Sequence, residues 1–216
     1  HCFVYIRGEF DLPYRRLAAA VEEAYAAGYF GERILGTDFS CDIVVYRGAG
    51  AYVAGEASGL ISSLEGKKGY PRNRPPRLTV KGLYQRPTVV NNVESLSNIA
   101  WIIGHGAAAF KEVGTPKSPG TRLFSVSGHV NRPGVYEVEL GYPWMKFLDE
   151  DCGGIRGGRA IKCVVPGGVS SKVLTGAEIA NLKLAHEDLW DVGSTLGSGG
   201  MIVIAEGTCM VRLMQI

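Results

Sequence analysis

The chain has 216 residues, a formal net charge of +2, 46% hydrophobic residues and 20% charged residues. These values fit a soluble globular protein of one large domain or two small ones, and the near-neutral charge selects no class of partner. No apolar run approaches about 18 residues, so we expect no membrane span and no direct membrane insertion. The five cysteines lack C-x-x-C spacing, which argues against a disulfide framework, a zinc site or an iron–sulfur site in this stretch and favours a cytoplasmic setting.

The first 65 residues alternate strands and helices, a pattern typical of an α/β layer. The predicted elements are a strand at 3–7, a helix at 13–27, a strand at 41–46, a glycine turn at 48–50 and a helix at 55–64. The unbroken apolar run at 43–45 predicts a buried parallel strand, and Gly28 is the expected stop of the first helix. Because the chain opens with His1 at the start of a predicted strand, we expect it to belong to a longer polypeptide.

The remaining residues predict an extended loop, one long helix and a small β-rich module. In order these are a loop at 66–90, a helix at 91–104, a linker at 113–120, strands at 122–127 and 135–140, a short helix at 144–149, and strands at 161–165 and 201–205. Asn91 followed by Glu94 resembles a capping box with Asn as the cap. The second half is therefore predicted to be a mixed α+β domain.

The glycine turn is the first candidate for chemistry. Backbone amides in a glycine turn between a strand and a helix can face an anion, which suggests a phosphate or nucleotide site. The dinucleotide fingerprint G-x-G-x-x-G requires a glycine at position 53, where this chain has Val53. Such a turn more often serves to pack a helix tightly against a sheet, and from these residues alone both interpretations stay open.

A basic stretch at 67–81 and the pair Asn91 and Asn92 are the other candidates. The stretch has six basic residues and no acid, so it would hold phosphates or another protein, or it is a solvated loop. Nucleic acid is disfavoured because only Tyr70 and Tyr84 could stack on bases. The asparagines would cap a helix, or hydrogen-bond a polar ring or a phosphate. No nucleophile and base occur together, so we assign no catalytic acid or base and no metal ligand.

Several motifs along the chain agree in order and spacing with one known family. Residues 48–56 (GAGAYVAGE) resemble the G-x-G-x-Y-[ILV]-C-G-E-E signature of the NADH-binding flavoprotein subunit of respiratory complex I, shared with soluble NAD-linked hydrogenases and formate dehydrogenases. The further matching segments are 5–9 (YIRGE), 63–66 (SLEG), 71–76 (PRNRPP), 82–83 (GL), 87–88 (PT), 90–94 (VNNVE), 123–128 (LFSVSG), 133–138 (PGVYEV) and 197–203 (GSGGMIV). The resemblance thus covers nearly the whole chain.

The resemblance implies a fold and a domain order. Residues 1–112 would be the C-terminal part of a Rossmann-like FMN- and NADH-binding α/β layer, and residues 113–120 a linker. Residues 121–206 would be a ubiquitin-like, soluble-ligand-binding β-grasp domain. Residues 207–216 would begin the segment that leads to an iron–sulfur helical domain, whose cluster motif does not occur in this sequence.

The resemblance also implies an activity. NADH would pass a hydride to FMN, and electrons would then leave singly for iron–sulfur clusters, including a 4Fe-4S cluster whose ligands lie outside this chain. Neighbouring iron–sulfur subunits would be the partners, and a complex I subunit would lie in the cytoplasm, peripheral to the membrane. The cofactor-binding residues carried over are Gly48, Gly50, Tyr52, Gly55, Glu56, Arg74, Asn91 and Asn92. Of these, Tyr52, Gly55 and Glu56 would lie beside the flavin and nicotinamide, and Asn91 and Asn92 would contact the flavin or its ribityl phosphate.

Some positions depart from the family pattern. Ala57 stands where the family has a second Glu that is expected to help place NADH, Ala54 stands where it has a Cys, and Gly59 stands where it has another small residue. Arg74, in contrast, keeps the positive charge of a basic residue that the family has near the nucleotide. The family's upstream glycine-rich loop also does not occur here, so we expect the chain alone not to oxidise NADH. The alternative hypothesis is a non-catalytic binding or docking module of a related paralogue.

Overall fold

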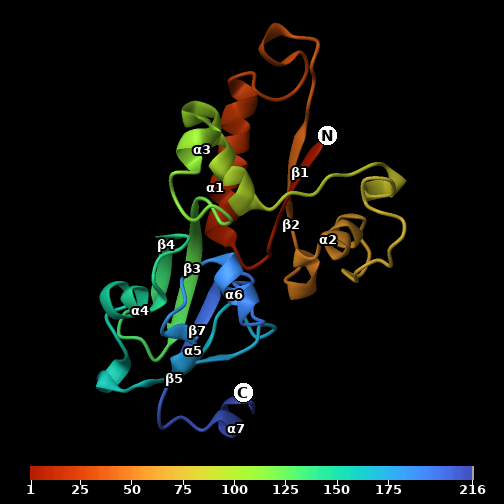
Figure 1. The fold of residues 1–216 in the computed structure, drawn as a ribbon. Helices are drawn as coiled ribbons and strands as arrows, with labels where there is room; N and C mark the ends of the chain where they lie inside the picture. The colour runs from red at the N-terminus through yellow and green to blue at the C-terminus, as the bar shows by residue number, and fades with distance from the viewer. Residues whose placement is uncertain (216) are drawn as a thin grey trace. The chain divides into compact units, whose positions relative to one another are not determined.

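The computed structural model of the chain describes residues 1–215 (Figure 1). The chain divides into two compact units, His1–Asn92 and Val93–Ile216. The first unit carries the glycine turn and the basic stretch, and the second carries the β-rich module. Each unit is described by itself.

The first unit begins with the predicted strand–helix–strand arrangement. β1 (Cys2–Ile6) and β2 (Ile43–Arg47) pair in parallel, with Cys2 opposite Ile43 and Ile6 opposite Arg47. Between them lie α1 (Asp11–Ala26) and η1 (Ile34–Gly36). Gly28 follows α1 at φ +75°, a left-handed conformation that glycine adopts without a Cβ penalty, so the predicted helix stop is confirmed.

The expectation of a fully buried second strand is wrong for this unit. None of residues 43–45 is fully buried, and Val44 is 45% exposed. The cause is that only two strands form the sheet, and α1 buries none of its own residues. The apolar run therefore identified the parallel pairing correctly but not the degree of burial.

The glycine turn leads into two short helices and a long irregular segment. η2 (Tyr52–Gly55) precedes α2 (Ala57–Leu64), so the helix predicted at 55–64 begins two residues later, with Glu56 as its N-cap. The predicted loop at 66–90 is confirmed except for one turn of 3₁₀ helix, η3 (Leu83–Gln85). Ala54 and Ile61 are each about 1% exposed and anchor this region.

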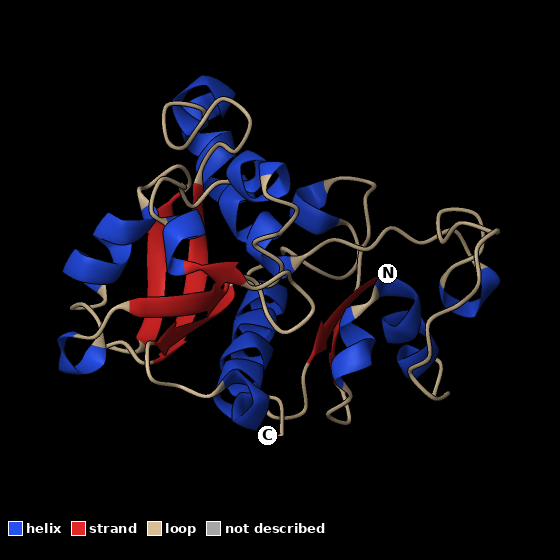
Figure 2. Ribbon diagram, turned by 60° about the horizontal axis from the view of Figure 1, so that its bottom comes forward, coloured by secondary structure: helices blue, strands red, loops and turns tan. Residues whose placement is uncertain are grey.

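The second unit contains a five-stranded mixed sheet in the order β4-β3-β7-β5-β6 (Figure 2). Its strands are β3 (Thr121–Gly128), β4 (Gly134–Glu139), β5 (Ile161–Val165), β6 (Leu174–Thr175) and β7 (Gly200–Ala205). β3 and β4 form the predicted hairpin, whereas β3 and β7 pair in parallel although more than 70 residues separate them. This arrangement is consistent with a β-grasp layout.

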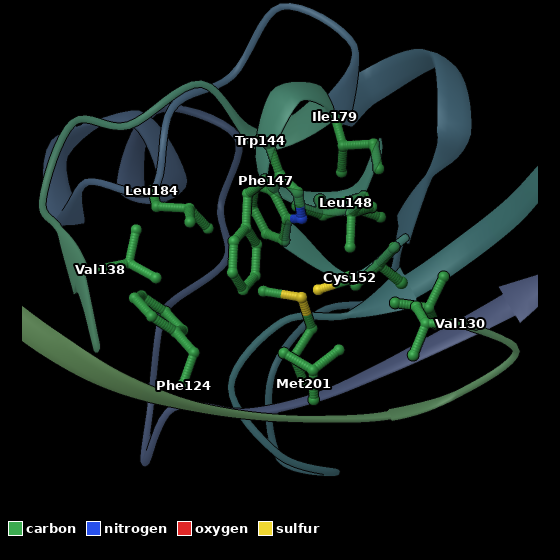
Figure 3. Packing of buried hydrophobic residues seen from close by; sticks show 14 of the residues in the cluster. Phe124, Val130, Val138, Trp144, Phe147, Leu148, Cys152, Ile179, Leu184 and Met201 are labelled. Carbon is green, nitrogen blue, oxygen red and sulfur yellow. The ribbon is translucent and has the colours of Figure 1, made fainter. Parts of the chain in front are cut away.

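The apolar side chains of this unit form one main core and a smaller cluster of Cys163, Val165 and Ile204, and several helical segments accompany the sheet. Their bounds are α3 (Val93–Phe110), α4 (Trp144–Lys146), η4 (Phe147–Asp151), η5 (Arg156–Gly158), α5 (Gly176–Ile179), α6 (His186–Asp191) and α7 (Met210–Leu213). Figure 3 shows Trp144 and Phe147 pointing toward Phe124 and Met201. All four side chains are fully buried, and burying each such side chain stabilises the fold by roughly 1.5–3 kcal/mol.

The expected linker at 113–120 is held in place within the second unit. The carboxylate of Glu187 accepts hydrogen bonds from Thr115 Oγ1 and from Ser118 Oγ, the latter at 2.5 Å. Gly114 N–H donates to Glu139 at 2.9 Å, and Ser118 is buried. The two compact units meet at residues 92 and 93, upstream of this segment. Proline and glycine composition predicted a loop here but did not reveal that Glu187, 69 positions after Ser118 and 72 after Thr115, holds it.

In residues 1–215, no helix combines the length and the apolar character that a membrane span requires. Over the same residues, no three His, Cys, Asp or Glu side chains lie together as metal ligands would.

Candidate functional site

The glycine turn is held against the first strand by a close approach that only glycine permits. Gly48 is buried, and a Cβ at this position would lie 2.6 Å from Cζ of Tyr5 and closer still to its hydroxyl. The Tyr5 hydroxyl lies 3.0 Å from Ser63 Oγ on α2. Gly48 therefore serves the packing role, because its missing side chain lets β1, the turn and α2 meet.

The next residues of the turn present backbone donors. In the described part of the chain, the N–H groups of Ala49, Gly50 and Ala51 donate to no protein acceptor. Gly50 adopts φ +85°, and consecutive amides around a left-handed residue form a concave site suited to an anion. The Glu9 carboxylate approaches the turn, and a Cβ on Gly50 would lie 3.7 Å from it. Glu9 is paired with Arg7 at 2.9 Å, which offsets part of its charge.

Glu56 connects this turn to the basic stretch. Its carboxylate accepts hydrogen bonds from the N–H groups of Ser58 at 2.9 Å and Gly59 at 3.0 Å, and from the Ser58 hydroxyl. It also lies 3.1 Å from the guanidinium of Arg74. The Ser58 hydroxyl, together with these amides and Arg74, holds the pKa of Glu56 below its usual range despite partial desolvation. Glu56 is therefore a fixed anion rather than a proton donor near neutral pH.

Tyr52 and Gly55 present an open surface on the outer side of the turn. Tyr52 is 80% exposed, and a Cβ placed on Gly55 would meet no atom within 4 Å. Packing within the unit therefore does not require glycine at position 55, in contrast to position 48. Ala57, the first residue of α2, adds no carboxylate beside Glu56.

A second carboxylate, Glu65, organises the basic stretch from the end of α2. Its side chain is 3% exposed and lies 2.9 Å from Arg72 and 2.8 Å from Lys67. The amide N–H of Tyr84 also donates to it at 2.9 Å. Burial raises the pKa of Glu65, but the Lys67, Arg72 and Tyr84 contacts outweigh that effect and bring it to about 2. Glu65 is not among the predicted site residues, although it is the acid directly before a long acid-free basic segment.

The basic stretch lines a cavity of about 280 Å³ that is open to solvent. Four cationic side chains line it, Lys67, Arg72, Arg74 and Lys81, together with the amides of Asn73 and Gln85. Arg72 is fixed in the wall because it also donates to Ser62 Oγ at 3.1 Å and to the Gly82 carbonyl at 3.3 Å. The stretch is thus partly built into the fold, not simply a solvated loop.

The predicted site residues fall into two groups. Gly48 and Gly50 lie in the glycine turn, Tyr52 and Gly55 lie in η2 that follows it, and Glu56 and Arg74 are in direct contact. Asn91 and Asn92 are exposed and lie directly before α3, which begins at Val93. The residue adjoining this helix is therefore Asn92 rather than the predicted cap, Asn91.

Comparison with known protein families assigns both units. A model of the Nuo51 FMN-binding domain matches residues 1–101, and a model of the SLBB domain matches residues 123–173. The first match contains the glycine turn, Glu56, Arg74 and the asparagine pair, and the second contains most of the mixed sheet. The order of the two domains agrees with the expectation from the motifs.

Curated relatives and solved structures agree with these matches. The chain is 44% identical over 211 residues to the F 2 subunit of NADH-quinone oxidoreductase of Rhizobium meliloti, covering 98% of this chain and 50% of that protein. It is 46% identical over 215 residues to the F subunit of NADH-quinone oxidoreductase of Mycobacterium bovis, covering 100% of this chain and 48% of that protein.

The fold is similar to a chain of an NAD⁺-reducing [NiFe]-hydrogenase in the H₂-reduced state, with a TM-score of 0.80 and 35% identity over 98% of this chain and 34% of that chain. This chain thus spans about half the length of the curated relatives it matches. It belongs to the family of the NADH-quinone oxidoreductase F subunits, and it carries that family's Nuo51 FMN-binding domain followed by an SLBB domain.

Proposed function

We propose that the full-length protein containing this chain is an FMN-dependent flavoprotein subunit that oxidises NADH. The observation that carries the proposal is the Glu56–Arg74 contact at 3.1 Å, because it joins the N-cap of α2, next to η2 and the exposed Tyr52, to the basic stretch within the segment that matches the FMN-binding domain. The relatives are named as F subunits of NADH-quinone oxidoreductase, which supports NADH as the reductant.

The residues present fit a flavin phosphate and an aromatic ring system. The unbonded amides of residues 49–51 offer donors to an anion, and the missing side chain at Gly55 leaves an open surface for a flat ring. FMN, when bound, supplies the chemistry that takes a hydride from NADH and releases electrons singly. The residues of this chain would position the flavin and the nucleotide and would provide charged groups beside them.

Each residue has a definite part in this proposal. Tyr52 and Gly55 form the wall beside the ring, and Glu56 keeps that wall in place by capping α2. Arg74 contributes positive charge near the nucleotide phosphates. Asn91 and Asn92 offer amide groups to the flavin or its phosphate. No group here acts as an acid or base, since the ionised Glu56 carboxylate is already occupied by two backbone N–H groups and Ser58.

The rest of the electron path lies outside this chain in our proposal. A 4Fe-4S cluster in the remaining part of the full-length protein, followed by neighbouring iron–sulfur subunits, would accept the electrons. The complex would place the subunit in the cytoplasm, peripheral to the membrane. Residues 1–112 would serve the FMN and NADH domain, residues 121–206 the β-grasp domain, and residues 207–216 the connection to the cluster domain.

NADH-dependent reduction of ferricyanide tests the proposal. The full-length protein, supplied with FMN, is expected to catalyse it, and residues 1–216 alone are expected not to. Flavin-loaded full-length protein that binds its partner subunits but reduces no ferricyanide would contradict the enzyme assignment. It would favour a docking module instead. Activity of the isolated 216-residue chain would contradict our view that the site needs further sequence.

A further inference from the structure

The first turn of α3 carries a carboxylate that reaches the mixed sheet. Glu94 Oε1 accepts a hydrogen bond from the backbone N–H of Leu123 at 2.9 Å, and both residues belong to the second unit. A glutamate in the first turn of a helix commonly serves that helix alone, because its charge interacts favourably with the helix dipole. Glu94 also connects two domain matches, since it lies in the match to the FMN-binding domain and Leu123 is the first residue of the match to the SLBB domain.

The sheet uses this acceptor because β7 does not extend far enough to supply one. β3 pairs with β7 only from Ser125, whose N–H donates to the carbonyl of Gly199. Backbone N–H groups along a strand point alternately to its two sides, so the N–H of Leu123 points to the same side as that of Ser125. Leu123 lies two residues before the end of this ladder, and a backbone donor without a partner costs free energy. Glu94 therefore takes the place of a strand partner.

Apolar packing does little to hold the start of α3. None of its 18 residues is fully buried in the described part of the chain. Its far end is fixed by Phe110, whose ring lies where a Cβ on Gly120 would be. The helix is interrupted between these ends at Gly106, which has φ +88°, so the Phe110 contact does not set the direction of the first turns. That direction depends on the polar contact of Glu94.

A neighbouring positive charge favours the same contact. Burial holds the pKa of Arg122 below its usual range, and the negative charge of Glu94 acts in the opposite direction. The Arg122 guanidinium donates to the carbonyl of Gly197, which keeps it at this end of the sheet. Glu94 and Arg122 also line one small cavity of about 120 Å³ together with Glu137. The Glu94 carboxylate thus has both a hydrogen-bond donor and a cation on the β-grasp side.

The start of α3 continues directly from the asparagine pair. Asn91 and Asn92 are exposed, and Asn92 is joined by a peptide bond to Val93, the first residue of the helix. We propose that Glu94 is a positioning residue of the flavin site, through which the β-grasp module fixes the first turn of α3 and, with it, the asparagine pair. The inference rests on the proposed function for the contact between the asparagines and the flavin. It gives the β-grasp module a part in flavin binding without any contact of its own with the flavin.

Fluorescence titration of the flavin-free full-length protein with FMN tests this role. Glu94→Ala removes the acceptor, and we expect the Kd for FMN to rise about tenfold, as for loss of a charge-assisted hydrogen bond. Glu94→Gln keeps a side-chain oxygen that accepts the Leu123 N–H, so it is expected to restore a Kd close to that of the wild type. The matched control is Glu137→Ala, because Glu137 lines the same cavity but accepts from Thr121 at 2.6 Å. The control is expected to keep the wild-type Kd.

A double-mutant cycle with Asn92→Ala separates positioning from a general loss of stability. If Glu94 acts through the asparagine pair, Glu94→Ala adds little to the loss of FMN affinity that Asn92→Ala already causes. The same loss in both backgrounds, or equal Kd values for Glu94→Ala and the wild type, would overturn the inference and leave the proposed function standing. Wild-type protein that binds no FMN would overturn the proposed function itself.

A second variant keeps the test open if Glu94→Ala does not fold. Glu94→Asp retains the charge but withdraws the carboxylate from the Leu123 N–H by one methylene group. It is expected to weaken FMN binding in the same way, and hydrogen exchange of the Leu123 amide is expected to become faster in it. Wild-type FMN affinity in Glu94→Asp despite faster exchange at Leu123 would show that the contact does not position the flavin site, and the inference would be wrong.

Discussion

The carboxylate of Glu65 lies 2.9 Å from the guanidinium of Arg72, and only 3% of the glutamate side chain is exposed to solvent. This contact joins the end of α2 to the segment that lines the basic cavity. Because removal of one partner leaves the other charge poorly solvated, breaking a buried ion pair strongly destabilises the fold. The pair therefore controls whether the cavity keeps its form.

Glu65→Gln is expected to lower the free energy of unfolding of this region at neutral pH by as much as about 3 kcal/mol, because the folded structure lowers the pKa of Glu65 to about 2. A carboxyl group whose pKa is lowered by folding stabilises the fold at pH values above its unfolded pKa, which is near 4.5 for Glu65. This contribution is lost as the pH falls toward 2. Hydrogen exchange of the α2 amides in the full-length protein, measured at pH 7 and pH 4, should show a larger difference between variant and wild type at pH 7. Equal protection at pH 7 would contradict this expectation, and Glu22→Gln on the exposed side of α1 is the control.

Gly48 in the glycine turn and Gly55 at the end of η2 should respond differently to substitution. Gly48→Ala brings a Cβ into collision with the Tyr5 ring and is expected to cost about 1–3 kcal/mol of unfolding free energy, as overpacking does. Gly55→Ala meets no atom within 4 Å and should leave the melting temperature nearly unchanged. Thermal unfolding of the two variants checks the contrast, and a similar loss in both would show that the turn is packed differently.

The segment at 113–120 should become mobile when its anchor is removed. Glu187→Gln weakens the hydrogen bonds from Thr115 and Ser118, which also hold the pKa of Glu187 below its usual range. Amides of residues 114–118 are expected to exchange at least several-fold faster with solvent deuterium. Asp191→Asn, at the exposed end of α6, is the matched control and should leave this segment protected. Unchanged exchange in Glu187→Gln would mean that other contacts hold the segment.

Neighbouring residues on β3 test the core of the second unit. Phe124 is fully buried and lies 6.1 Å from the ring of Phe147, whereas Leu123 points to the other face and is 49% exposed. Phe124→Ala is expected to cost about 3–5 kcal/mol through lost burial and a residual cavity. Leu123→Ala should cost much less. Urea unfolding curves give both values, and comparable losses would contradict the assigned faces of the strand.

The sequence predicted those elements whose periodicity extends over several turns or residues. The parallel pair β1 and β2, helix α1 and the β3–β4 hairpin were all predicted within a few residues of their bounds. The two-residue strand β6 and the four-residue helix α5 were not, because so short a segment carries no periodic signal and is fixed by its neighbours in the sheet.

The candidate site was predictable in part. The motif around Glu56 and the cationic character of Arg74 were visible in the sequence, but their contact was not, since it depends on how residues 66–90 fold back over α2. The role of Glu65 is hidden for the same reason. The packing role of Gly48 requires the position of Tyr5, which lies more than 40 residues earlier in the chain.

Fluorescence titration of the flavin-free full-length protein with FMN tests the central claim most directly. It should be made on the wild type and on Gly55→Leu, whose added side chain would project from the surface that we assign to the flavin while meeting no protein atom at its Cβ. We predict saturable quenching of flavin fluorescence in the wild type and at least tenfold weaker binding in the variant, with equal melting temperatures of the flavin-free proteins. Equal affinity for FMN in both proteins, or no quenching in the wild type, would contradict a flavin site at this turn.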